Sequence, residues 1–321
     1  MSGGVIGIAG AGAFGTALAV ALAAGGREVR LWARDPAQRA AMRQDRSSAH
    51  LPGITLPETV GLPDDLEALA AAEAVLLALP MQALRGFLSG PGQALLAQDL
   101  VACCKGIDLA TLQGPSAVMR AAGAMGAVAV LTGPSFAADI ARGLPTALTL
   151  ACDGPEATAL QHALSTPTLR LYRTEDVAGA ELGGALKNVI AIAAGVVMGA
   201  GLGDSARAAL ITRGFAEMQR LAGDLGARPE TLAGLSGLGD LILTCTSAQS
   251  RNYSHGFALG QGGVPPVATV EGVATAQAAA RLAAERGVDL PVASMVARLV
   301  AQDIGVAEAV RELMSRPLKQ E

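Results

Sequence analysis

Three glycines near the amino terminus carry the clearest chemical signal in the chain. Gly10, Gly12 and Gly15 follow an apolar run at residues 5–9 and open a helical pattern at residues 13–24. In this setting the first glycine permits a tight turn, and the second lets a pyrophosphate approach the backbone. The third lets the helix pack closely on the strand. Unpaired N–H groups at the helix N-terminus suit phosphate oxygens. The motif therefore predicts dinucleotide binding.

The end of the second expected strand should bind the ribose of that cofactor. The chain there runs Leu31-Trp32-Ala33-Arg34-Asp35. An acidic side chain at this place binds the 2′-hydroxyl of NAD, whereas an arginine favours the 2′-phosphate of NADP. Because Arg34 comes first, we expect a preference for NADPH, with use of both cofactors as the alternative.

Lysines are rare, and two of the three lie in candidate motifs. Lys105 follows an expected strand at residues 100–104, where a cation could hold an anionic substrate, although a solvated loop lysine is the alternative. Lys187 lies one turn before a strongly apolar segment. Desolvation lowers the pKa of a lysine, which suits proton exchange with a substrate oxygen near neutral pH. The alternative for Lys187 is a side chain that extends to solvent.

Residues 237–252 are dense in polar side chains. Hydroxyls, a carboxylate and an amide accompany Arg251 there. An arginine among small donors suits a phosphate dianion, although a polar loop with a helix cap would look the same. His50, His162 and His255 have no spacing that indicates a role, and the four cysteines show no metal-ligand or disulfide spacing. We therefore expect no metal site.

An alternation of strands and helices must position these residues up to about residue 178. The expected strands are residues 5–9, 28–32, 74–79, 100–104, 128–131, 146–151 and 169–172. This alternation predicts an α/β, Rossmann-type fold, with a mostly parallel sheet and helices on both faces. Ligands of such a sheet bind at the carboxyl ends of its strands.

The remainder of the chain lacks strand patterns. We expect a dinucleotide-binding domain over residues 1–178 and an all-helical substrate and catalytic domain over residues 179–321. The expected helices of the second domain are residues 179–198, 206–225, 229–235, 270–286, 292–301 and 305–316. Residues 46–58 and 250–266 are expected to be loops.

Composition limits the class of protein. With 321 residues and 51% hydrophobic residues, the chain can bury the cores of two domains. A net charge of −4 without basic runs gives no indication of nucleic-acid binding. The N-terminus lacks a secretory pattern, and the apolar segment at residues 189–202 is too short to span a bilayer. We expect a soluble, cytoplasmic protein without membrane insertion.

Six segments along nearly the whole chain carry a resemblance to a known family. They are residues 10–19, 131–143, 183–193, 209–220, 237–252 and 270–272. The most specific sequences are GPSFA, LKNVIAI and LGDLILTCTSAQSRN. The chain resembles the bacterial NAD(P)-dependent sn-glycerol-3-phosphate dehydrogenases.

The resemblance implies an oxidoreductase that transfers a hydride from NADPH or NADH to dihydroxyacetone phosphate. The product, sn-glycerol 3-phosphate, is a precursor of glycerophospholipids. By the resemblance Lys187 is the catalytic proton donor and acceptor. The implied substrate-binding residues are Lys105, Gly133, Ser135, Lys187, Asp240, Ser250, Arg251 and Asn252. With the glycine motif included, the implied cofactor contacts are Gly10, Gly12, Ala13, Phe14, Gly15, Arg34, Lys105, Ala137, Arg251 and Glu271.

Two positions depart from the family's pattern. Ala13 stands where the family often has serine, and Thr269 where an aliphatic residue is more common, which leaves cofactor affinity open. A related 3-hydroxyacid-type dehydrogenase and a non-catalytic NAD(P)-binding regulator are the alternatives. The polar stretch at residues 250–252 favours a phosphorylated substrate, and Lys187 favours an enzyme. The oligomeric state stays open, with a homodimer as one option.

Overall fold

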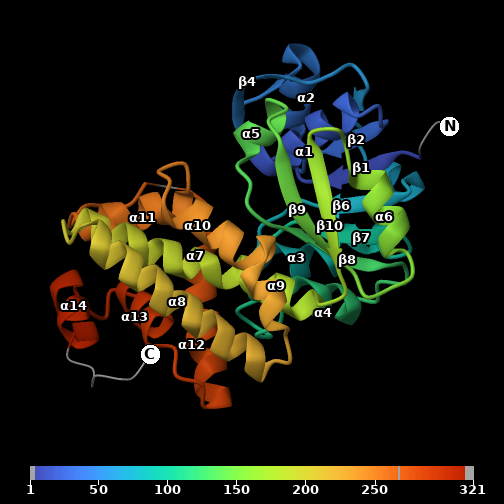
Figure 1. Cartoon of the computed structure of the whole chain (residues 1–321). Helices are drawn as coiled ribbons and strands as arrows, with labels where there is room; N and C mark the ends of the chain where they lie inside the picture. Colours follow the sequence, from blue (N-terminus) through green and yellow to red (C-terminus); the bar gives the residue numbers. More distant parts are fainter. Residues whose placement is uncertain (1–3, 267, 315–321) are drawn as a thin grey trace.

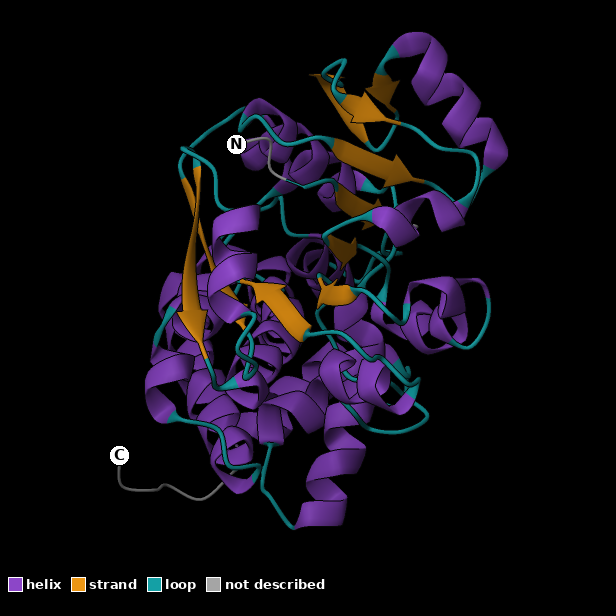
Figure 2. Ribbon diagram, turned by 90° about the vertical axis from the view of Figure 1, so that its right-hand side faces the viewer, coloured by secondary structure: helices purple, strands orange, loops and turns teal. Residues whose placement is uncertain are grey.

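The structure, a computed structural model, describes residues 4–266 and 268–314. Figure 1 shows an α/β part, drawn in blue to green, beside a part built from helices, drawn in yellow to red. Figure 2 shows the same arrangement from the side, with the strands in the upper part and mostly helices below.

Eight strands form one sheet with the order β10-β9-β8-β7-β6-β1-β2-β5. Neighbouring strands are parallel throughout, apart from the antiparallel pair β8 and β9. This confirms the mostly parallel sheet. The strands are β1 (Ile6–Ala9), β2 (Val29–Trp32), β5 (Val60–Gly61), β6 (Ala74–Leu77), β7 (Asp99–Ala102), β8 (Val128–Thr132), β9 (Thr146–Ala151) and β10 (Leu169–Thr174).

Helices cover both faces of the sheet, as expected. On one face, Ile6 and Ile8 of β1 pack in the same core cluster as Leu18 of α1. On the other face, Leu77 of β6 packs with Leu84 of α3. The helices of this part are α1 (Ala13–Ala24), α2 (Pro36–Asp45), α3 (Met81–Leu88), α4 (Pro115–Ala121), α5 (Ala137–Ala141) and α6 (Ala157–Leu164). Short 3₁₀ helices at Leu66–Ala71 and Pro91–Leu95 complete it.

The helical part is built around α7 (Val177–Gly199), which begins where the Asp176 carboxylate accepts the Gly179 N–H at 2.9 Å. Most of its residues are buried against the neighbouring helices. Those helices are α8 (Asp204–Asp224), α9 (Pro229–Ala233), α10 (Asp240–Cys245), α11 (Arg251–Gly260), α12 (Glu271–Arg286), α13 (Pro291–Val300) and α14 (Val306–Met314). A π-helical turn at Leu235–Gly239 leads into α10. The expected end of the last helix at residue 316 lies outside the described residues.

Helix α7 is longer than the apolar segment at residues 189–202 suggested. Across the described residues, it is the one helix long and apolar enough to cross a membrane by length and composition. Of the most apolar 18-residue window of this helix, 89% is buried inside the fold. The prediction of length concerned residues 189–202 alone and does not extend to the longer helix, whereas the interpretation as a buried core helix agrees with the packing.

The expected loop at residues 46–58 is wrong, because a hairpin forms there. Strands β3 (Ser47–Ser48) and β4 (Leu51–Thr55) pair antiparallel. Leu51 is buried in a cluster with Ala17 of α1 and Ile140 of α5. This contact holds the hairpin against the N-terminal end of α1.

The expected loop at residues 250–266 is also wrong, because α11 occupies most of it. The Ser250 hydroxyl caps this helix by accepting the Tyr253 N–H at 3.2 Å. A Cβ at Gly195 of α7 or at Gly256 of α11 would overlap a carbonyl oxygen of the facing helix. The glycines that look like helix breakers in the sequence therefore let two helices pack closely.

Candidate active site

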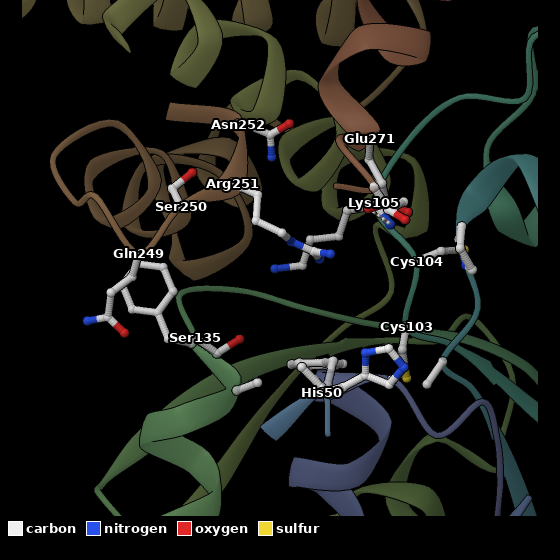
Figure 3. Close-up of a pocket in the computed structure, with 18 of the residues that line it drawn as sticks. His50, Cys103, Cys104, Lys105, Ser135, Gln249, Ser250, Arg251, Asn252 and Glu271 are labelled. Atoms are coloured by element: carbon white, nitrogen blue, oxygen red, sulfur yellow. Dashed lines mark hydrogen bonds between the residues drawn. The ribbon is translucent and has the colours of Figure 1, made fainter. Parts of the chain in front are cut away.

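A cavity of about 660 Å³ opens between the sheet and the helical part. Its walls come from the N-terminal end of α1, the β3–β4 turn, the loops after β6, β7 and β8, and the helices α7, α10, α11 and α12. Figure 3 shows Arg251 and Lys105 close together in this cavity, with His50 and Ser135 across from them. The site therefore lies at the carboxyl ends of the strands, as expected for this fold.

The glycine turn at one end of the cavity fits a dinucleotide pyrophosphate. Gly10 has a φ of +114°, which L side chains rarely adopt, and a Cβ at Gly15 would overlap the Gly10 carbonyl. A Cβ at Gly12, in contrast, would meet nothing within 4 Å, so a ligand has room to approach the backbone. Ala13 and Phe14 open α1 and line the cavity. The N–H groups of this first turn have no intrahelical acceptor and suit phosphate oxygens.

Two lysines that line the cavity share one buried carboxylate behind them. Asp240 Oδ1 lies 2.9 Å from Lys187 Nζ, and Asp240 Oδ2 lies 2.6 Å from Lys105 Nζ. Thr244, four residues after Asp240 on α10, accepts from Lys187 Nζ at 2.7 Å. Asp240 is 1% exposed and Lys187 is 7% exposed. Three charges therefore share a nearly dry site.

Burial and charge set the protonation of this cluster. Burial lowers the pKa of Lys187 to about 8, although the Asp240 carboxylate opposes this shift. Burial alone would raise the pKa of Asp240, but the two ammonium groups outweigh it and hold that pKa below its ordinary value. The cluster thus contains an anion at neutral pH beside an amine that can exchange a proton in that range.

Sheet topology brings Lys105 to this cluster. Lys105 follows β7 and Gly133 follows β8, and parallel neighbours end at the same edge. Lys105 Nζ donates to the Gly133 carbonyl at 2.9 Å, and the Ser135 hydroxyl donates to the same oxygen at 3.4 Å. The lysine is thereby held and is not a solvated loop residue, since its side chain is only 13% exposed.

Glu271 closes another side of the cavity at the start of α12. Its Oε1 accepts the Met81 N–H at 3.0 Å, and its Oε2 accepts the Lys105 N–H at 3.3 Å. Burial raises the pKa of the Glu271 carboxyl, while these two hydrogen bonds oppose the shift. Glu271 therefore joins the loops after β6 and β7 to the helical part.

Most of the predicted site residues lie together along this cavity. Those that line it are Gly12, Ala13, Phe14, Lys105, Ser135, Ala137, Lys187, Ser250, Arg251, Asn252 and Glu271. Five others are not lining residues. Gly10 and Gly15 shape the turn, Gly133 supplies its carbonyl to Lys105, and Asp240 lies behind the lysines. Arg34 is exposed at the end of β2.

Several lining residues were missed by sequence reasoning. Asn188 follows Lys187, and Thr244 lies four residues after Asp240 on one helix face, so helical spacing could have found both. His50 was assigned no role, yet the β3–β4 turn carries it into the cavity wall. Nothing local could have indicated His50, because the hairpin itself was taken for a loop. Among the described residues no group of His, Cys, Asp or Glu could hold a metal ion.

Comparison with known proteins extends this picture to the whole chain. Residues 5–158 match the family model for the N-terminus of NAD-dependent glycerol-3-phosphate dehydrogenase, and residues 176–311 match the model for its C-terminus. The glycerol-3-phosphate dehydrogenase [NAD(P)+] of Cereibacter sphaeroides is 61% identical, covering 99% of this chain and 100% of that protein. The enzyme of the same name from Paracoccus denitrificans is 59% identical, covering 98% and 99%.

A solved structure agrees with this assignment. The crystal structure of glycerol-3-phosphate dehydrogenase from Coxiella burnetii matches with a TM-score of 0.93 and 35% identity, covering 98% of this chain and all of that one. Its similarity includes both the sheet and the helical part. With the glycine turn, the buried lysines and both family models in agreement, the chain belongs to the NAD-dependent glycerol-3-phosphate dehydrogenase family.

Proposed function

We propose that this chain reduces dihydroxyacetone phosphate to sn-glycerol 3-phosphate with NADPH or NADH, and catalyses the reverse oxidation. The observation that carries the proposal is Lys187, a buried amine with a pKa of about 8 that faces the same cavity as the glycine turn. Its relatives are named for this activity.

Lys187 would act as the proton donor and acceptor. When bound, the reduced nicotinamide supplies a hydride to the ketone carbon. The Lys187 ammonium gives one proton to the ketone oxygen, which becomes the alcohol, and the neutral amine takes it back in the reverse direction. Asp240 and Thr244 fix the position of Nζ by accepting from it. Lys105, held on the same carboxylate, offers a second cation for a substrate oxygen.

The start of α11 would bind the substrate phosphate. Ser250, Arg251 and Asn252 all line the cavity there. A guanidinium can meet two phosphate oxygens at once, and the first turn of a helix adds unpaired N–H donors. Gly133 and Ser135 lie in the loop after β8, and together with Asp240 they complete the proposed substrate set.

The cofactor would extend from the glycine turn toward α12. Gly10, Gly12 and Gly15 form the turn, and its expected neighbours are Ala13, Phe14, Ala137, Lys105, Arg251 and Glu271. Asp35 uses its carboxylate to cap α2, accepting the Ala37 N–H at 2.9 Å. Because that acid is engaged, Arg34 is the side chain available to a 2′-phosphate, which supports a preference for NADPH.

The finer assignments follow the same reasoning. We infer a dinucleotide-binding domain over residues 1–178 and a substrate and catalytic domain over residues 179–321, since α7 begins at Val177 and the second family model begins at residue 176. We also propose a cytoplasmic homodimer, without membrane insertion or nucleic-acid partners, whose product supplies glycerophospholipid synthesis. Sedimentation of the purified protein tests the dimer.

Steady-state oxidation of NADPH tests the reaction itself. Dihydroxyacetone phosphate should support turnover, and unphosphorylated dihydroxyacetone should be a poor substrate. Turnover with a 3-keto acid in place of dihydroxyacetone phosphate would instead indicate a 3-hydroxyacid-type dehydrogenase. Cofactor binding without turnover of either substrate would indicate a regulator.

A further inference from the structure

A closed circuit of hydrogen bonds passes through the backbone of Lys105. The Lys105 carbonyl accepts from Asn188 Nδ2 at 3.3 Å. Asn188 Oδ1 accepts from Asn252 Nδ2 at 2.9 Å, and Asn252 Oδ1 accepts the Gly272 N–H at 2.9 Å. Glu271, the neighbour of Gly272, completes the circuit by accepting the Lys105 N–H. We call these five residues the amide ring.

The amide ring joins four separate segments of the chain. Lys105 lies in the loop after β7, Asn188 on α7, Asn252 on α11, and Glu271 and Gly272 at the start of α12. The two peptide groups that flank the Lys105 Cα are thereby held, one through its carbonyl by an amide and the other through its N–H by a carboxylate. The ring therefore connects the sheet to the helices that carry the proposed phosphate and cofactor contacts.

The hydrogen bonds of the amide ring have one allowed direction. A backbone N–H can only donate, so Gly272 fixes the oxygen of Asn252 toward α12 and its Nδ2 toward Asn188. Asn188 must then turn its own Nδ2 to the carbonyls of Lys105 and Gly184, each at 3.3 Å. Asn188 is 3% exposed, so water has little access to replace a lost bond. An aspartate at either position would set two acceptors against each other.

We propose that Asn188 and Asn252 are positioning residues that couple the substrate side of the site to its cofactor side. They hold the backbone of Lys105 and the first turn of α12 in place before either ligand binds. This inference rests on the proposed function, which assigns Lys105 to the substrate and Glu271 to the cofactor. Asn252 thus acts on the cofactor side as well as in the proposed phosphate site, because its oxygen holds the residue after Glu271.

Gly272 offers a way to open the amide ring without changing either amide. A Cβ at Gly272 would lie 2.7 Å from Asn252 Oδ1 and 2.7 Å from the Asn188 carbonyl oxygen. Carbon and oxygen atoms do not approach so closely without a bond, so Gly272→Ala must move α12 away from α7 and α11. Its effects should therefore match those of Asn188→Asp, which sets two acceptors against each other, and of Asn252→Ala, which removes the acceptor of the Gly272 N–H.

Two measurements on the protein without substrate test the coupling. Amide hydrogen exchange at position 272 should accelerate about tenfold or more in all three variants, because the acceptor of that N–H is displaced in Gly272→Ala, loses its support in Asn188→Asp and is removed in Asn252→Ala. The Kd for NADPH, measured by fluorescence titration, should rise about tenfold in each. In turnover, the KM for NADPH should rise more than kcat falls.

Gln261→Glu is the matched control. It makes the same amide-to-carboxylate change on an exposed residue directly after α11, outside the ring, and should alter neither measurement. If Asn188→Asp does not fold, Asn252→Ala and Gly272→Ala carry the test. An unchanged Kd for NADPH in folded ring variants, with only the KM for dihydroxyacetone phosphate raised, would overturn the inference. A wild-type protein that binds no NADPH would refute the proposed function instead, and the exchange rates would still report on the ring.

Discussion

Replacing Asp240 by asparagine should move the pH dependence of the reaction, because Asp240 is the carboxylate that both site lysines share. Its oxygens lie 2.9 Å from Lys187 Nζ and 2.6 Å from Lys105 Nζ, and only 1% of the residue is exposed. The asparagine side chain would keep the shape but remove the charge, and its N–H₂ group would face one ammonium as donor against donor. The ammonium form of Lys187 would lose its counter-charge in a nearly dry site.

The expected change in the pKa of Lys187 follows from the two opposing effects that set this pKa in the wild-type protein. Burial lowers the pKa of Lys187 to about 8 while Asp240 opposes that shift. A close opposite charge is worth about 1–3 pKa units, so without it the pKa of Lys187 should fall to about 5–7. At pH 7 the protonated fraction would then drop from about nine-tenths to between about one-half and one-hundredth. Reduction requires the protonated amine, so its rate at pH 7 should fall by about 2- to 100-fold from protonation alone.

The pH dependence of the rate has opposite signs for reduction and for oxidation. In the wild-type protein, reduction should slow as pH rises through about 8, and oxidation should accelerate over the same range, because it uses the neutral amine. In Asp240→Asn both transitions should move to lower pH. At pH 7 the neutral fraction of Lys187 should therefore rise, so from protonation alone oxidation should gain about 5- to 11-fold while reduction loses.

Initial rates from the absorbance of reduced nicotinamide, at saturating substrates between about pH 5 and 10, provide the measurement. Circular dichroism should first show that the variant is folded, since breaking a buried ion pair can cost about 3–5 kcal/mol. Asp204→Asn, which removes an exposed carboxylate at the start of α8, is the control and should leave the transition at about pH 8. If Asp240→Asn lowers the plateau but leaves the transition unmoved, Asp240 does not set the proton affinity of Lys187.

Three further substitutions test the remaining roles. Lys187→Ala should lower kcat by about two to four orders of magnitude with little change in cofactor Kd, and near-normal turnover would exclude Lys187 as the proton carrier. Arg34→Ala should weaken NADPH more than NADH in paired Kd titrations, because only NADPH carries the 2′-phosphate, and equal losses would exclude Arg34 from ribose recognition. Arg251→Lys should lower kcat/KM for dihydroxyacetone phosphate despite the retained charge, since lysine cannot form two parallel bonds to phosphate. An equal loss with unphosphorylated dihydroxyacetone would mean that Arg251 is structural, and Lys105 would become the candidate for the phosphate.

The local sequence was sufficient to predict the elements whose conformation depends on one short segment of the chain. The apolar run, the glycines and the helix that follows them predict β1, the turn and α1, because a strand, a tight turn and a helix N-terminus each depend on near neighbours. The seven expected strands all lie in the observed sheet. The carboxyl edge of that sheet as the place of the ligand site also follows from the alternation of strands and helices.

The sequence was not sufficient to predict secondary structure that depends on packing against distant segments of the chain. Residues 250–266 were expected to be a loop, but close packing of Gly256 against α7 makes a helix favourable there, although glycine has low helix propensity. The hairpin near His50 likewise depends on the burial of Leu51 against α1 and α5.

The electrostatics of the site depended on tertiary structure in the same way. Lys105, Lys187 and Asp240 were each singled out, yet no spacing in the chain indicates that one carboxylate bridges both amines. Desolvation and Coulomb interactions depend on distances in space, and segments from β7, α7 and α10 meet only after folding. The residue types that can do the chemistry were therefore determined by the sequence, whereas their charge states and contacts were decided by the packing of the sheet against the helices.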